Sequence, residues 1–182
     1  HNQLKDVNFK NGYIVFGLGT FATYYPYDFK NTNSQLILFR ETIDVLKDLE
    51  IPILMKPHYS TQMQIVHEEL GKINKKNFFV TYAHPTLLAL QAKIWICNTY
   101  STTCGDAFGL GVPTIEYTDY SDKLKKYTNN LSVNPDHIDH FISQDKKKLK
   151  YTLFKILNEK KIKRQRIFPV DKNNLIDSLI KN

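Results

Sequence analysis

The chain has few cysteines, few glycines and no long apolar run. Among its 182 residues are only two cysteines, Cys97 and Cys104, too few for a disulfide framework or a zinc site. We expect both to be free thiols in a reducing compartment. No apolar stretch approaches the roughly 18 residues of a membrane span, and no signal peptide is recognisable at the N-terminus. Neither a membrane-spanning protein nor a disulfide-stapled secreted domain is expected.

What is present is typical of a globular protein. Apolar residues make up 42% of the chain and charged residues 24%, which argues against disorder. A chain of this length can bury a core without covalent staples. We expect one domain over residues 1–182, located in the cytoplasm.

The net charge of +7 is concentrated in the last third of the chain. Residues 1–120 carry 10 basic and 11 acidic residues, a net of −1, whereas residues 121–182 carry 15 and 7, a net of +8. Such a segment can bind nucleic acid or an anionic membrane surface, or it can be a solvated helix face. Nucleic acid is disfavoured, because no aromatic stacking motif accompanies the charge.

Short apolar segments alternate with segments of helical periodicity. The predicted strands span 13–16, 51–55, 78–82, 94–97 and 113–117. Helices are predicted to begin near Ser34 as a cap, Met63, His84 and Ser101. Because the strands are almost entirely apolar, they are expected to be buried on both faces, as in a parallel sheet covered by helices. The fold class is therefore α/β: a Rossmann-like, doubly wound parallel sheet of about five or six strands with helices on both faces.

The basic C-terminal part, residues 135–182, is expected to be helical. A short helix is predicted over 135–142, followed by a longer one over 144–163 capped by Ser143. Lysines and arginines surround its apolar stripe, which fits a basic amphipathic helix on anionic lipid. A solvated helix that packs its stripe on the sheet is the other interpretation.

The loops after the strands should hold the site, because ligands of doubly wound sheets bind at the carboxyl ends of the strands. These loops are 17–25, 56–61, 82–86, 98–105 and 117–121. Gly17-Leu18-Gly19-Thr20 resembles the start of a dinucleotide fingerprint but lacks the third glycine, so an NAD site is not expected. Either a tight turn or a loop that lets a ligand approach would need glycine there.

A hydroxyl-rich segment follows the fourth predicted strand. Ser101, Thr102 and Thr103 stand where a buried strand gives way to a helix. Hydroxyl groups and free backbone N–H groups at such a point favour anion binding. Helix capping by Ser101 or Thr102 would explain the same residues.

The segment after these hydroxyls resembles the C-terminal half of GT-B glycosyltransferases. Asp106-Ala107 and Gly111-Val112-Pro113 match that superfamily's acidic residue followed by Ala, then Gly-x-Pro and a strand. The resemblance implies that Ser101, Thr102 and Thr103 bind the phosphate of a nucleotide sugar. It also implies that Asp106, which stands where Glu is usual, binds the ribose.

Two further elements resemble glycosyltransferase motifs. Lys56-Pro57-His58 is similar to the Lys-Pro-His-Pro element of bacterial polymer-forming transferases that use CDP- or CMP-linked donors, with Tyr59 in place of the second Pro. Tyr82-Ala83-His84-Pro85 resembles a His-Pro element of bacterial sialyl- and Kdo-transferases that contacts the nucleotide.

These resemblances imply roles for the remaining candidate residues. Lys56 and Gly19 would contact the phosphate, and Tyr82 and Pro85 the ribose or base. His58 and His84 would neutralise phosphate or act as a general acid; packed histidines hydrogen-bonded in loops are the alternative. No metal is expected, because the pair His137 and His140 lacks a further ligand.

The predicted function is the nucleotide-sugar-binding half of a GT-B glycosyltransferase in bacterial surface polysaccharide synthesis, of capsule, lipopolysaccharide or teichoic-acid type. The donor would be CMP-, CDP- or UDP-linked, with no separate cofactor. Expected partners are a glycan or lipid-linked acceptor, an N-terminal GT-B domain missing from this chain, and an anionic membrane at its inner face. The isolated domain is expected to be inactive alone. Alternatives are a UDP-sugar 2-epimerase-like domain and a non-catalytic α/β interaction domain.

Overall fold

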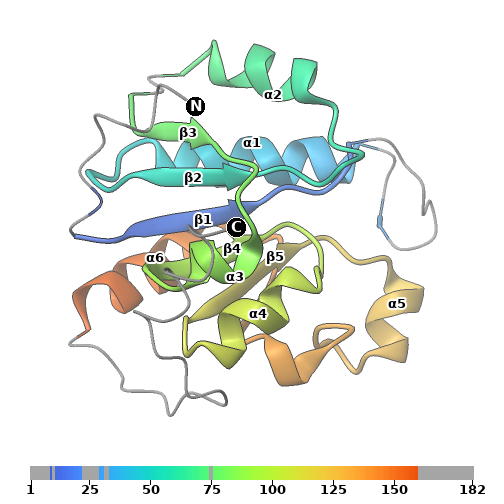
Figure 1. Ribbon diagram of the computed structural model, residues 1–182. Coiled ribbons are helices and arrows are strands. Elements are labelled where there is room, and N and C mark those ends of the chain that lie inside the picture. Colours follow the sequence, from blue (N-terminus) through green and yellow to red (C-terminus); the bar gives the residue numbers. More distant parts are fainter. Residues whose placement is uncertain (1–8, 10, 22–28, 31–32, 74–75, 160–182) are drawn as a thin grey trace.

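The fold is built on a single parallel sheet. The computed structural model describes residues 9, 11–21, 29–30, 33–73 and 76–159. Among these, six strands pair in the order β3-β2-β1-β4-β5-β6, and every pairing between neighbours is parallel (Figure 1). The strands are β1 Tyr13–Gly17, β2 Ile53–Lys56, β3 Phe78–Val80, β4 Ala92–Cys97, β5 Thr114–Thr118 and β6 His140–Ser143. The predicted doubly wound α/β fold is confirmed.

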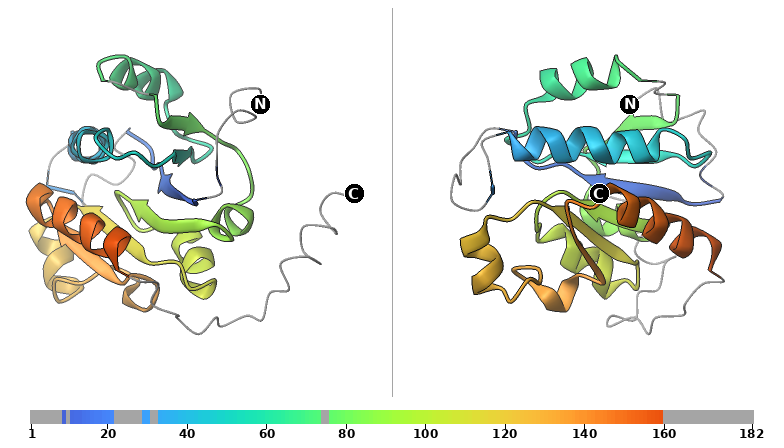
Figure 2. Two further views of the ribbon diagram at one scale, coloured as in Figure 1. Left: turned by 90° about the vertical axis from the view of Figure 1, so that its left-hand side faces the viewer. Right: turned by 180° about the vertical axis from the view of Figure 1, so that it is seen from behind.

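Helices cover both faces of this sheet. They are α1 Ser34–Leu46, α2 Met63–Leu70, α3 Pro85–Ala89, α4 Thr103–Gly109, α5 Asp122–Tyr127 and α6 Lys146–Asn158, with a 3-10 turn, η2, at Pro135–His137. In Figure 2, α1 and α6 lie on one side of the sheet and α3 and α4 on the other. This arrangement follows from right-handed crossovers that run in opposite directions from the middle of the sheet.

Successive residues of a strand pack into two separate hydrophobic cores, because side chains alternate between the two faces of a strand. Ile14 and Phe16 point into the core formed with α1, α2 and α6. Val15 and Trp95 point into the core formed with α3 and α4. The central strands are therefore apolar at consecutive buried positions, such as Ile94 to Cys97 of β4, which is the pattern the sequence shows.

The segment after residue 120 differs from the prediction. The expected helix over 135–142 is wrong: Pro135 opens only the turn η2, and His140–Ser143 form the edge strand β6. β6 pairs with β5, with Ile142 opposite Tyr117. The pairing with β5 and the burial of Ile142 therefore determine the structure here, rather than the weak helical periodicity of residues 135–142. Consequently His137 and His140 do not share a helix.

Two predicted caps are also wrong. The last helix begins at Lys146, and Asp145, not Ser143, caps it by accepting a hydrogen bond from the Lys148 backbone N–H at 2.9 Å. Ser34 is the first residue of α1, and its hydroxyl donates to Asp119 Oδ2 at 3.0 Å. The predicted helical residues 160–163, like the rest of 160–182, lie outside the described residues.

The C-terminal segment also contains a helix that the sequence did not predict. α5 is short and has no buried residue, so it lacks the apolar periodicity by which helices are recognised. Within the described ranges, no helix combines the length and apolarity needed to cross a bilayer.

Candidate functional site

The direction of the chain connections reverses between β1 and β4. From β1 the chain moves outward to β2 and β3, and it then returns to β4 and moves the other way to β5 and β6. In α/β sheets, ligands bind at the carboxyl edge of the strands at such a point. The two adjacent loops are residues 18–21 after β1 and 98–102 after β4. We call them the β1 loop and the β4 loop.

Lys56 and Cys97 end the strands on either side of Gly17. In the sheet register Gly17 is paired with Lys56 of β2 and with Cys97 of β4. Since parallel strands are about 4.8 Å apart, the Lys56 and Cys97 backbones are separated by about 10 Å. A small anion between these strand ends would therefore be within reach of both Lys56 and the β4 loop.

Close packing explains Gly19 of the β1 loop. A Cβ added at Gly19 would lie 3.2 Å from Thr99 Cγ2 of the β4 loop. A Cβ at Gly17 would lie 3.4 Å from the Trp95 indole nitrogen and 3.9 Å from Thr103 Oγ1. Glycine at position 19 therefore lets the β1 loop pack closely against the β4 loop, whereas the distances at Gly17 are ordinary van der Waals contacts.

The β1 loop is also fastened to the loop after β2. Thr61 Oγ1 donates to the Gly19 carbonyl at 2.8 Å, and the Phe21 backbone N–H donates to Gln62 Oε1 at 2.8 Å. The His58 backbone N–H donates to the Leu18 carbonyl at 3.2 Å. Three strand ends are thus joined at one edge. Thr61 and Gln62 were not predicted as site residues, because isolated polar residues in a loop carry no distinctive sequence signal.

Lys56 supplies an unpaired positive charge at this edge. Its ammonium group donates to the Pro57 carbonyl at 3.0 Å. No carboxylate of the described residues forms an ion pair with it. His58 is exposed and its ring shares a 2.8 Å hydrogen bond with Ser60 Oγ. The charge of Lys56 therefore remains available to an anion.

The predicted hydroxyl cluster lies beside β1, at the start of α4. Ser101 Oγ and Thr103 Oγ1 are 3.0 Å apart, while Thr102 is exposed. Thr102 is the N-cap of α4, but its side chain makes no capping hydrogen bond. Side-chain capping by Thr102 is therefore wrong, whereas Ser101 Oγ accepts a hydrogen bond from the Thr103 backbone N–H at 3.4 Å, as the capping alternative predicts for Ser101. Since α4 has only seven residues, the hydroxyl groups, rather than its helix dipole, are the candidate ligands.

Buried ionisable groups lie on β4, β5 and α4. Glu116 of β5 is fully buried and accepts hydrogen bonds from Ser132 Oγ at 2.6 Å and from Tyr120. Burial raises the pKa of Glu116 above its ordinary value. The thiols of Cys97 and Cys104 lie 3.2 Å apart in the same interior. Hydrogen bonding to Cys104 and burial raise the pKa of Cys97, which keeps its thiol protonated.

The turn η2 supports the far side of the β4 loop. The Asn134 side-chain amide donates to Tyr100 Oη at 2.8 Å, and that hydroxyl lies 3.4 Å from His137 Nδ1. Any side chain at Gly105 would meet the His137 ring, since a Cβ there would lie 3.0 Å from Nδ1. His137 is thus a packing residue, and no sequence pattern predicted its position beside this loop.

His84 and Asp106 belong to a second group on the α3–α4 side. His84 caps α3, its ring nitrogen accepting from the Thr86 backbone N–H at 3.3 Å, and Pro85 is the first helical residue. The Thr86 hydroxyl donates to Asp106 Oδ1 at 3.4 Å. Tyr82 is 70% exposed. No contact within the described part of the chain links this group to Lys56 or His58.

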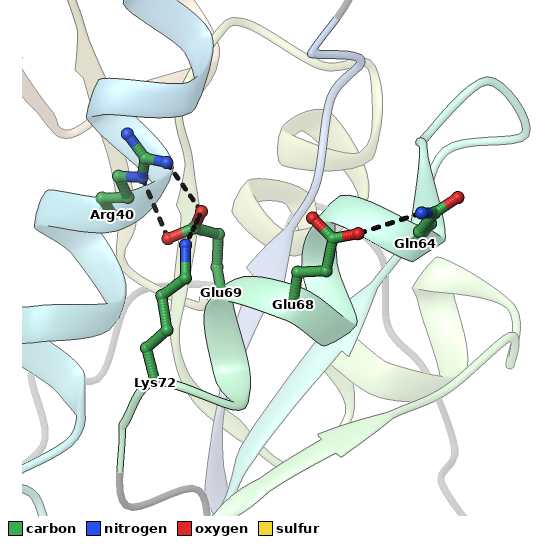
Figure 3. Close-up of polar contacts among 5 residues, drawn as sticks. All are labelled: Arg40, Gln64, Glu68, Glu69 and Lys72. Carbon is green, nitrogen blue, oxygen red and sulfur yellow. Dashed lines mark hydrogen bonds and ion pairs between the residues drawn. The ribbon is translucent and has the colours of Figure 1, made fainter.

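A surface pocket of about 320 Å³ lies elsewhere, between α1, α2 and α6. Arg40 donates to both carboxylate oxygens of Glu69, at 2.9 and 2.7 Å, and Lys72 adds a contact at 2.7 Å (Figure 3). The Glu69 carboxylate is thus shared by two cations, and its contact with Arg40 connects α1 to α2. We interpret this pocket as a packing feature and not as the site.

Comparison with known proteins agrees at the level of the fold. No protein-family model matches this chain, and no curated protein matches its sequence. The structure is similar to that of the UDP-GlcNAc 2-epimerase of Methanocaldococcus jannaschii, crystallised with UDP-GlcNAc and UDP. That match has 17% identity and a TM-score of 0.56, and it covers 93% of this chain and 45% of the epimerase.

The glycosyltransferase of kitacinnamycin is a second structural neighbour. It has 13% identity and a TM-score of 0.55, over 85% of this chain and 37% of the transferase. At these identities the likeness establishes a shared Rossmann-like fold. The chain spans less than half the length of either neighbour.

Proposed function

We propose that this chain is the nucleotide-sugar-binding domain of a GT-B-like glycosyltransferase. One observation carries the proposal: the unpaired Lys56 and the hydroxyls of Ser101 and Thr103 lie around Gly17. Gly17 ends β1, at the point where the direction of the strand connections reverses. The two structural neighbours support the proposal, because one is a glycosyltransferase and the other was crystallised with UDP-GlcNAc and UDP.

The cationic and hydroxyl groups at this edge of the sheet suit the phosphate part of a nucleotide-sugar donor. During sugar transfer, negative charge develops on the departing phosphate, and fixed donors directed at it lower the barrier. Lys56 would provide the positive charge, while Ser101, Thr102 and Thr103 would donate hydrogen bonds. Close packing at Gly19 keeps the β1 loop near the β4 loop, which carries Ser101 and Thr102.

The remaining candidates would act on other parts of the donor. His58 lies next to Lys56 in sequence and is exposed, so it would neutralise phosphate or donate a proton. Tyr82, Pro85 and Asp106 would contact the ribose or base from the α3–α4 side. His84, which belongs to the same group, would neutralise phosphate or act as a general acid. Asp106 is only partly buried and binds a single hydroxyl of Thr86, so it keeps capacity to accept from a ribose hydroxyl.

The pathway is proposed on the sequence resemblance alone. The Lys56-Pro57-His58 element is similar to that of bacterial polymer-forming transferases, which favours synthesis of a capsule or another surface polysaccharide. A glycan or lipid-linked acceptor and a second GT-B domain would complete the reaction, and the domain alone would bind the donor without transferring the sugar.

A 2-epimerase-like domain is the second candidate, favoured by the structural match to the M. jannaschii enzyme. Nuclear magnetic resonance of UDP-GlcNAc incubated with the chain would reveal its C2 epimer. Formation of that epimer would favour this candidate over a transferase. A non-catalytic α/β domain would bind no nucleotide at all.

The proposed phosphate contacts are tested by calorimetry with UDP, CDP and CMP. We expect Lys56→Gln to weaken binding of the preferred nucleotide by on the order of tenfold, since hydrogen bonds to charged groups contribute about 1.5–3 kcal/mol. The double variant Ser101→Ala/Thr103→Ala should also weaken binding. Lys93→Gln, an exposed lysine at the other end of β4, is the matched control. Unchanged affinity in both site variants would refute the phosphate assignment.

A further inference from the structure

The solvent-facing side of α6 combines lysines with exposed aromatic side chains. The helix packs Leu149, Thr152 and Leu153 against the sheet. Tyr151 and Phe154 are nevertheless 69% and 40% exposed. At about 3.6 residues per turn, these two aromatic residues lie on the side of α6 opposite the buried stripe, and they stay exposed within the part of the chain that the structure describes.

Lysines flank the aromatic residues along this side. We define the α6 face as the following exposed residues: Lys147, Lys148, Lys150, Tyr151, Phe154 and Lys155. Lys147, Lys150, Tyr151 and Phe154 follow the i, i+3, i+4, i+7 spacing of one helix face. Lys148 and Lys155 lie beside them toward the other flank. The Lys150 ammonium is 6.0 Å from the centre of the Phe154 ring.

Most of this positive charge is not neutralised by the domain itself. Lys147, Lys148 and Lys150 form no ion pair with any carboxylate of the described chain, and Lys155 has only the exposed Glu159 at 3.7 Å. By contrast, Lys146, which points toward α1, is paired with Asp44. The unpaired charge is therefore confined to the side of the helix that faces away from the sheet.

We propose that the α6 face docks on a membrane surface rich in anionic phospholipid. Lysine ammonium groups are attracted to such a surface, and aromatic side chains at the centre of the face would enter the interface between headgroups and acyl chains. A helix that presents aromatic residues flanked by lysines places the charged ends in water and the rings toward lipid. The occupant this face fits is an anionic lipid surface.

Charge argues against two other occupants from the same protein. Residues 160–182 contain seven basic and two acidic residues, a net of +5, and would be repelled by the lysines of the α6 face. A second copy of the chain carries +7 and would present the same positive face. Both occupants would bring like charges together, whereas anionic headgroups supply the opposite charge.

The kind of basic residue argues against nucleic acid. Of the 25 basic residues in the chain, 22 are lysine and 3 are arginine, and every basic residue of the α6 face is lysine. Specific contacts to phosphates and bases favour the planar, bidentate guanidinium group. Attraction to a diffuse layer of headgroups requires only point charges, which lysine provides.

Co-sedimentation of the full chain with vesicles tests this proposal. We expect recovery with phosphatidylglycerol–phosphatidylcholine vesicles, little with phosphatidylcholine alone, and loss of binding as salt is raised. The triple variant Lys147→Gln/Lys148→Gln/Lys150→Gln should reduce partitioning by on the order of fivefold for each charge removed. A matched triple variant at exposed lysines elsewhere, Lys76→Gln/Lys93→Gln/Lys123→Gln, has the same net charge and should bind much more strongly than the α6 variant.

The aromatic residues are tested separately. Tyr151→Gln/Phe154→Gln keeps the charge and the helix-forming tendency, and it should weaken binding to anionic vesicles, whereas Tyr127→Gln on α5 should not. Circular dichroism of each variant shows whether the fold is retained. Equal recovery with neutral vesicles, or equal effects of the α6 and control variants, would overturn the proposal. Tighter binding to a single-stranded oligonucleotide that is lost in the same α6 variants would assign the face to nucleic acid instead.

Discussion

Replacing Glu69 by Gln should destabilise the fold, whereas the same change at its neighbour Glu68 should not. The Glu69 side chain is 8% exposed and accepts hydrogen bonds from Arg40 and Lys72. Glu68 is exposed and contacts only the side chain of Gln64 (Figure 3). A glutamine at position 69 would place an amide N–H group against the guanidinium donors. The two variants thus make the same chemical change, but only Glu69→Gln removes a carboxylate that binds Arg40 and Lys72.

The size of the effect follows from the contacts. Hydrogen bonding to Arg40 lowers the pKa of Glu69 from 4.5 to about 2, a difference that corresponds to roughly 3 kcal/mol. Because the side chains of Arg40 and Lys72 are 49% and 61% exposed, solvent screening reduces this value. We expect Glu69→Gln to lower the free energy of unfolding by about 1–2 kcal/mol near neutral pH. Glu68→Gln should change it by less than about 0.5 kcal/mol.

Urea unfolding of the wild type and the two variants measures these differences, with an expected shift in midpoint of about 0.5–1 M for Glu69→Gln. The pH dependence adds a second criterion. Since the folded-state pKa of Glu69 is lowered, its contribution is complete above about pH 4.5 and is lost as pH falls through about 2. The gap between wild type and Glu69→Gln should therefore shrink over this range. Equal midpoints for the two variants, or a gap that does not change with pH, would refute the reasoning.

Two further predictions concern α6 and the buried thiols. Asp145→Ala should lower stability by about 1 kcal/mol because it removes the helix cap, whereas Ser143→Ala should change it by less than about 0.5 kcal/mol, and thermal unfolding distinguishes the two outcomes. Cys97 and Cys104 are buried and the pKa of Cys97 is raised, so a thiol reagent such as Ellman's should label them only after unfolding. Rapid labelling of the native chain would contradict that placement.

The central strands were predictable because strands buried on both faces require runs of consecutive apolar residues, which are visible in the sequence. Both faces of β1 and β4 are covered by helices, so apolar residues occupy consecutive positions such as Ile14, Val15 and Phe16. The edge strand β6 has no such run of buried apolar residues, since only Ile142 among its four residues is buried. Its identity depends on pairing with β5, which is a contact between distant segments.

Caps and loop contacts were less predictable for the same reason. Ser34 has the side chain of a helix cap, but its hydroxyl binds Asp119, 85 residues away. The hydrogen bonds from Thr61 and to Gln62 that fasten the β1 loop also join separate strand ends. The glycines and hydroxyls of the candidate site were recognisable from the sequence because they follow predicted strands, whereas the residues that hold them in place were not.

Titration of the wild-type chain with nucleotides tests the central proposal most directly. Calorimetry with UDP, CDP and CMP, and with uridine as the control without phosphate, measures both affinity and the contribution of the phosphates. If the carboxyl edge at β1 and β4 holds the phosphates of a nucleotide sugar, at least one nucleotide should bind at sub-millimolar concentration and uridine should bind far more weakly. Absence of binding by all three nucleotides at millimolar concentration would contradict the proposal that this domain binds a nucleotide-sugar donor.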